Sequence, residues 1–175
     1  MSLLQPITPH LWFDREAREA AELYASVFPN SGIGEVRKLH GTPSGDAETV
    51  SFHLAGQPFM AISAGPHFRF TPAISFMANY DPSRDPQARE NLDRAWAVLS
   101  EGGKVFMPLD AYPFSKRYGW VQDRFGLSWQ IVPAALDEML RGSPEQVARV
   151  TQAFLKMKKF DIAARERAYA GGEDR

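Results

Sequence analysis

The chain has 175 residues, a formal net charge of −1, 44% hydrophobic residues and 23% charged residues. These values predict one folded domain with a buried core, and they exclude the strongly basic surface that nucleic acids and anionic membranes attract. No cysteine is present, which excludes disulfides, thiolate metal sites and a cysteine nucleophile and is typical of a reducing compartment. We therefore expect a cytoplasmic protein that binds neither nucleic acid nor membranes.

In the first half of the chain, the hydrophobic pattern predicts one helix and four strands. Apolar residues alternate over 7–13, which predicts a strand. Asp14 is a candidate N-cap for a helix over 15–28, where alanine and aromatic residues recur at helical spacing. Two glycines and a proline predict a loop over 40–47. The other three strands are expected at 34–39, 48–54 and 58–63.

The second half of the chain repeats this order of elements. The pattern predicts a strand over 73–79, a helix over 89–100 that ends at two glycines, and a short strand over 104–107. A loop with several aromatic residues is expected over 108–116. The half closes on a hairpin, with strands expected at 118–123 and 127–132.

The last part of the chain has a pattern that predicts helices alone. Ser143 and Pro144 have the chemistry of an N-cap and a first helical residue. We expect helices over 134–141, 144–157 and 161–169, the second with an apolar stripe formed by Val147, Val150, Ala153, Phe154 and Met157. Residues 134–175 are therefore predicted to be a C-terminal helical extension, and the apolar stripe is a candidate oligomer interface.

Two segments of the chain nearly repeat each other. Ile-Thr-Pro-His-Leu-Trp-Phe at 7–13 is echoed by Phe-Thr-Pro-Ala-Ile-Ser-Phe at 70–76, and the hairpin glycines Gly56 and Gly126 lie 70 positions apart. We interpret this as an internal duplication that gives two modules, about 5–66 and 68–133. A paired module usually forms its ligand site between its halves, so the repeat predicts where to look for function.

Several motifs of the chain resemble a known superfamily. They include the segments at 7–13 and 70–76, Gly-Gln-Pro-Phe-Met-Ala at 56–61 and Gly-Trp-x-x-Asp-x-Phe-Gly-Leu-Ser-Trp-Gln-Ile-Val-Pro at 119–133. The chain resembles the vicinal-oxygen-chelate superfamily, which contains glyoxalases, bleomycin-resistance proteins and extradiol dioxygenases. It is most similar to the PhnB-like branch, whose members often carry a demethylubiquinone-methyltransferase label.

The resemblance implies a fold and an assembly. We expect an α+β fold in which residues 1–133 form a glyoxalase-like domain of two βαβββ modules, with curved mixed sheets around a cavity. The cavity would hold a small-molecule ligand, and members of this family commonly form homodimers.

The resemblance also implies where a metal would bind. His10 lies on the first strand, where active members place a metal-binding imidazole, and Gln130 stands where metal-binding members often carry glutamate. The matching first-half position is Met60, and the first strand of the second half offers Ala73 or Ser75. We expect an incomplete metal site, with no cofactor or a weakly bound divalent metal and no nucleotide cofactor.

His10 and Gln130 are therefore the candidate catalytic residues, and we expect the His10 imidazole to hydrogen-bond with Gln130 or water. The candidate pocket residues are Trp12, Met60, Ser75, Tyr112, Trp120 and Gln122. Aromatic walls with a few amides and one imidazole suit a planar or apolar ligand. Trp129 should lie on the opposite face from Gln130, in the core.

Two hypotheses about function remain open at this point. The first is a protein that binds or sequesters an apolar or aromatic small molecule without strong catalysis. The second is a metal-dependent lyase, isomerase or dioxygenase that uses His10. A methyltransferase is less expected because the sequence has no Gly-x-Gly-x-x-Gly turn. Asp123 and Arg124 are interpreted as turn residues, and Lys116 and Arg117 as solvated charges or contacts for an anionic substrate.

Overall fold

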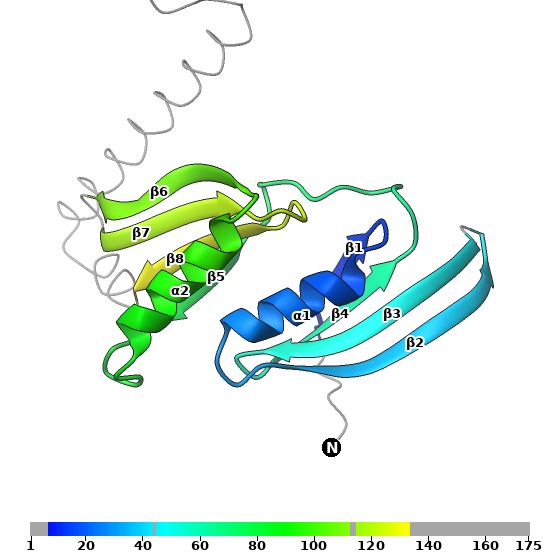
Figure 1. Cartoon of the computed structure of the whole chain (residues 1–175), viewed down its shortest axis with the longest axis horizontal. Helices are drawn as coiled ribbons and strands as arrows, with labels where there is room; N and C mark the ends of the chain where they lie inside the picture. The colour runs from blue at the N-terminus through cyan, green and yellow to red at the C-terminus, as the bar shows by residue number, and fades with distance from the viewer. Residues whose placement is uncertain (1–6, 44, 113–114, 134–175) are drawn as a thin grey trace, which may run out of the picture.

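The computed structural model describes residues 7–43, 45–112 and 115–133, with only the backbone of Lys116. These residues form two four-stranded mixed sheets and two helices (Figure 1). We call the sheets A and B. The α+β prediction is confirmed, and the sheets do not close into a barrel.

Sheet A belongs to the first half of the chain. Its strand order is β1-β4-β3-β2, with β1 parallel to β4 and the other neighbours antiparallel. The elements are β1 (His10–Phe13), α1 (Ala17–Val27), β2 (Gly32–Thr42), β3 (Gly45–Leu54) and β4 (Gln57–Ser63).

Sheet B belongs to the second half and has the same topology. Its strand order is β5-β8-β7-β6, with β5 parallel to β8. The elements are β5 (Phe76–Tyr80), α2 (Ala88–Ser100), β6 (Lys104–Tyr112), β7 (Ser115–Gln122) and β8 (Ser128–Pro133). Each half is therefore a βαβββ unit.

The two sheet hairpins are longer than the sequence pattern predicts. The expected loop over 40–47 is wrong, because β2 continues to Thr42 and pairs there with Gly45. The expected loop over 108–116 is also wrong, because β6 continues to Tyr112, which pairs with Ser115. The glycines and prolines that suggested loops are tolerated within β2 and β6, since the β2–β3 and β6–β7 pairs contain register shifts that accommodate an extra residue.

The start of α1 also differs from the prediction. Ala17, Ala20, Ala21, Tyr24 and Val27 form the buried stripe that the spacing predicts. Asp14 does not cap the helix. The helix begins at Ala17, and the residue before it, Glu16, makes no side-chain capping hydrogen bond. The Ala17 amide instead donates to the Ser63 hydroxyl at 3.0 Å. A residue at the end of β4 therefore performs the capping role, and sequence spacing cannot reveal such a partner.

The two helices lie next to each other in the middle of the molecule, and the halves share one core on the helix side of both sheets (Figure 1). Phe28 of the first half contacts Trp129 of β8 with ring centroids 5.3 Å apart, and Phe59 contacts Phe76 at 5.2 Å. Trp129 is 3% exposed, which confirms its predicted place in the core. We call the opposite surfaces, which turn away from the helices, the open faces of sheets A and B.

Strand pairing corrects one predicted equivalence between the halves. His10 pairs with Met60 in sheet A, and Met77 pairs with Gln130 in sheet B. Because Met60 and Gln130 occupy matching hairpin positions, the counterpart of His10 is Met77 rather than Ala73. Ala73 precedes β5, so the echo of the Thr-Pro motif is out of step with the strands by four residues.

The predicted helices of the extension over 134–175 lie outside the described residues and stay a prediction. Neither α1 nor α2, the helices of the described part, is long and apolar enough to cross a membrane.

Candidate functional site

The open face of sheet A carries the first group of predicted site residues. His10 and Trp12 alternate with the buried Leu11 and Phe13, so both side chains lie on the open face. His10 is exposed, and no hydrogen bond joins its imidazole to a described residue. Met60 is half-buried beside it on β4. The alternation in β1 was therefore enough to place His10 and Trp12 on one face.

Trp12 is held by residues that the sequence analysis missed. Its indole Nε1 donates to the carbonyl oxygen of Gly65 at 2.8 Å. The Trp12 ring meets Phe68 edge-on at 5.0 Å and His67 at 6.4 Å between ring centroids. Phe68 is still 66% exposed. Phe68 and the half-buried Trp12 beside His10 form a surface that an apolar molecule can cover, and the aromatic residues at 67–70 were the signal for it.

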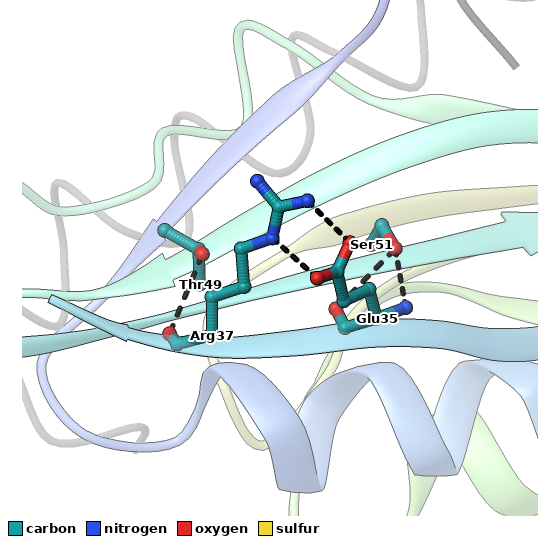
Figure 2. Close-up of polar contacts among 4 residues, drawn as sticks. All are labelled: Glu35, Arg37, Thr49 and Ser51. Carbon is teal, nitrogen blue, oxygen red and sulfur yellow. Dashed lines mark hydrogen bonds and ion pairs between the residues drawn. The ribbon is translucent and has the colours of Figure 1, made fainter. Parts of the chain in front are cut away.

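A polar group lies farther along the same face, on β2 and β3. Figure 2 shows Arg37, Glu35, Thr49 and Ser51 on the side of the strands away from α1. The Arg37 guanidinium donates to both carboxylate oxygens of Glu35, at 2.5 and 2.6 Å. The Arg37 guanidinium lowers the pKa of the Glu35 carboxyl. Because Arg37 already has a bidentate partner, it is a poor receptor for an anionic ligand.

The open face of sheet B holds Gln130 in a chain of hydrogen bonds. The Tyr118 hydroxyl donates to the Gln130 side-chain oxygen at 2.9 Å, and the Gln130 amide donates to the Ser75 hydroxyl at 2.7 Å. Within one chain, Gln130 uses its oxygen and its amide on sheet B, so the expected bond between His10 and Gln130 or water stays a prediction. Burial raises the pKa of Tyr118 well above its ordinary value, so this hydroxyl stays a donor.

The other predicted pocket residues lie beside Gln130. Trp120 pairs with Gln130 across the strands, and its indole donates to the Ser128 hydroxyl at 2.8 Å. Gln122 instead donates to the Gly126 carbonyl at 2.9 Å, so its amide stabilises the β7–β8 turn. Tyr112 packs edge-on against Tyr118 at 5.9 Å. Ser75 and Trp120 thus lie beside Gln130, Tyr112 packs on the Tyr118 ring, and Gln122 lies at the turn end of β7.

The donor set on these faces does not fit a divalent metal. Gln130 offers one neutral oxygen that already accepts a hydrogen bond from Tyr118, and the positions paired with His10 and Gln130 are the thioethers Met60 and Met77. Hard divalent cations prefer carboxylate and other strong oxygen donors. Within residues 7–43, 45–112 and 115–133, no three His, Asp or Glu side chains come together as a metal site.

A cavity of about 360 Å³ lies elsewhere, on the helix side of sheet B near the end of β8. Tyr80, Pro82, Ala88, Arg89, Leu92, Arg117 and Pro133 line it. None of the predicted catalytic or pocket residues lines it. Arg117, a candidate contact for an anionic substrate, donates to Asp93 instead.

Asp123 is more than the turn residue that the sequence suggested. It is 4% exposed and accepts hydrogen bonds from the Tyr24 hydroxyl at 2.7 Å and the Trp129 indole at 2.8 Å, as well as from the amides of Phe125 and Leu127. Burial raises the pKa of Asp123, and the four hydrogen bonds oppose this. Tyr24 belongs to α1, so Asp123 joins the two halves of the chain. Arg124 also joins them through an exposed ion pair with Glu19.

Solved structures with the same fold include a close sequence relative. A PhnB protein from Bacillus cereus is 34% identical, with a TM-score of 0.66, over 74% of this chain and 100% of that chain. A protein from Pseudomonas aeruginosa is 23% identical, with a TM-score of 0.57, over 74% and 98%.

More distant similarity shows the fold alone. A mutant of the fosfomycin resistance protein FosX from Listeria monocytogenes, solved with Mn(II) and 1S,2S-dihydroxypropylphosphonic acid, is 10% identical with a TM-score of 0.51, over 79% and 98% of the two chains. No curated protein matches this chain.

The sequence model of one family covers most of the chain. The model described as 3-demethylubiquinone-9 3-methyltransferase matches residues 5–132. Together with the two βαβββ units and the Bacillus cereus relative, this match confirms the resemblance first suggested by the motifs. The chain belongs to the 3-demethylubiquinone-9 3-methyltransferase family, which includes the PhnB protein of Bacillus cereus.

Proposed function

We propose that this protein binds a small, neutral, apolar or aromatic molecule on its open sheet faces and needs no resident metal to do so. The observation that carries the proposal is the chemistry of the two faces. Sheet A offers the Trp12–Phe68 aromatic pair beside His10, and sheet B offers Trp120 beside a Gln130 amide that is held in place. Aromatic walls with few oriented polar groups are typical of sites for such ligands.

The proposal includes a homodimer that builds each site from two chains. The contacts between the halves of one chain lie on the helix side, so the open faces turn away from their common core. A second copy would let the open face of sheet A in one chain meet the open face of sheet B in the other. Met77, which is 49% exposed beside Gln130, is a suitable residue for such an interface. An internal duplication would explain why the two sheets share one strand topology.

The metal-dependent alternative rests on one observation, the exposed imidazole of His10 on the strand where active members bind metal. It lacks carboxylate partners at the matching positions, so we place it second. A methyltransferase, as the family description suggests, is less favoured because the sequence contains no glycine-rich nucleotide turn.

Binding of the neutral fluorescent probe N-phenyl-1-naphthylamine tests the proposal. We expect Trp12→Ala to weaken probe binding about tenfold, because an aromatic contact of this kind contributes about 1.4 kcal/mol. Met77→Asp should abolish both the dimer in light scattering and tight probe binding.

A matched control separates the open faces from the cavity beside α2. Arg89 is exposed at the wall of that cavity, so Arg89→Trp should fill part of it and leave probe affinity unchanged. If Arg89→Trp abolished probe binding while Trp12→Ala bound the probe with unchanged affinity, the proposed site would be refuted.

A further inference from the structure

One end of the open face of sheet B is more buried than its counterpart on sheet A. Val132 and Tyr118 are 0% and 2% exposed, and they form a cluster of their own with Met107, Tyr112 and Trp120. The matching residues on sheet A are Ile62, two positions after Met60, and Thr49, two positions before Ser51. Both are only half-buried. The two open faces therefore differ although the sheets share one topology.

The described helices do not account for this difference. α2 packs on sheet B, but it lies on the side of Trp129 and Ile131, opposite Val132. A fully buried valine and tyrosine on a face without a described helix indicate that another part of the protein covers them.

The chain continues directly from this cluster. Pro133, the last residue of β8, follows Val132, and 42 residues come after it. The family model ends at residue 132, so these residues are an addition to the part that the family shares. The added sequence contains Leu136, Leu140, Val150 and Phe154 among its apolar residues.

We propose that residues 134–157 of the same chain pack over Val132, Tyr118, Met107 and Tyr112, at the end of the cluster away from the ligand surface of Trp120. A segment that begins at the edge of the cluster reaches it without a long connection, so closing the contact costs little loop entropy. The inference stands apart from the proposed ligand, because it concerns only what covers this cluster.

Disulfide trapping in the full chain tests the inference, because the protein has no cysteine of its own. Met107→Cys on sheet B is combined in turn with Leu140→Cys, Val150→Cys and Phe154→Cys. The matched control uses Met60→Cys, a half-buried methionine on the open face of sheet A. A disulfide forms readily only where the two Cα atoms come within about 7 Å.

We expect at least one of the three extension cysteines to form a disulfide with Met107→Cys within one chain. This disulfide should form at least about tenfold faster than the disulfide of the same extension cysteine with Met60→Cys, since contact raises the effective concentration. Non-reducing gels and peptide mass analysis distinguish bonds within a chain from bonds between chains. Bonds between chains would assign the cover to a second copy and overturn the proposal. Equal rates with Met60→Cys, or no disulfide at any position, would also overturn it.

Discussion

Replacing Tyr24 with phenylalanine removes a single hydroxyl that joins the two halves of the chain. Tyr24 is 0% exposed, and its hydroxyl donates to the Asp123 carboxylate at 2.7 Å. A buried hydrogen bond to a charged group contributes about 1.5–3 kcal/mol, and the change leaves Asp123 with three donors instead of four. We expect Tyr24→Phe to lower the free energy of unfolding by about 2 kcal/mol, which is about 30-fold in the equilibrium constant.

Tyr80→Phe is the matched control for this prediction. Tyr80 is 7% exposed, and its buried hydroxyl has no hydrogen-bond partner among the described residues. Removing an unsatisfied buried hydroxyl relieves a desolvation cost, so Tyr80→Phe should be neutral or slightly stabilising. Urea unfolding followed by circular dichroism at pH 7 measures both variants. If Tyr24→Phe costs no more than Tyr80→Phe, the role given to the Tyr24–Asp123 bond is refuted.

Three further predictions follow from the described contacts. A Cβ at Gly119 would overlap the Trp96 ring, so Gly119→Ala should lower the free energy of unfolding by about 1–3 kcal/mol in urea. Adding Trp96→Leu should restore part of that free energy, and a double variant whose loss equals the sum of the two single losses would contradict this. Burial raises the pKa values of Tyr24, Tyr80 and Tyr118, so the unfolded chain loses protons first and stability should fall as the pH rises above about 10. Tyr80→Phe should flatten that fall by up to about 1.4 kcal/mol per pH unit, and an unchanged slope would argue against it. Gln130→Leu removes the hydrogen bonds of Gln130 with the Tyr118 and Ser75 hydroxyls, which should cost about 1–3 kcal/mol, whereas Gln130→Glu keeps an oxygen acceptor at this position and should cost less; equal urea midpoints would contradict this.

The sequence predicts the parts of the fold that depend on local pattern. The spacing of Ala17, Ala20 and Tyr24 fixes the buried face of α1, and alternation in β1 places His10 and Trp12 on one face. The motif at 119–133 was specific enough for the family, which the family model then confirmed.

Contacts between distant segments were beyond the reach of the sequence. The Ser63 hydroxyl replaces the expected Asp14 cap, and Tyr24 reaches Asp123 across 99 positions. The Thr-Pro echo suggested Ala73 as the counterpart of His10, but strand register selects Met77. Register depends on pairing with β8, and a short repeated motif carries no information about that pairing.

Metal analysis of the purified protein tests whether this chain holds a divalent metal ion. We expect no stoichiometric divalent metal, by elemental analysis and by titration with Mn(II), while N-phenyl-1-naphthylamine still binds in the presence of a chelator. The reason is that Gln130 already shares its oxygen with Tyr118, and Met60 and Met77 hold the paired positions. One metal ion per chain that is lost in His10→Ala would contradict the account and favour the metal-dependent enzyme.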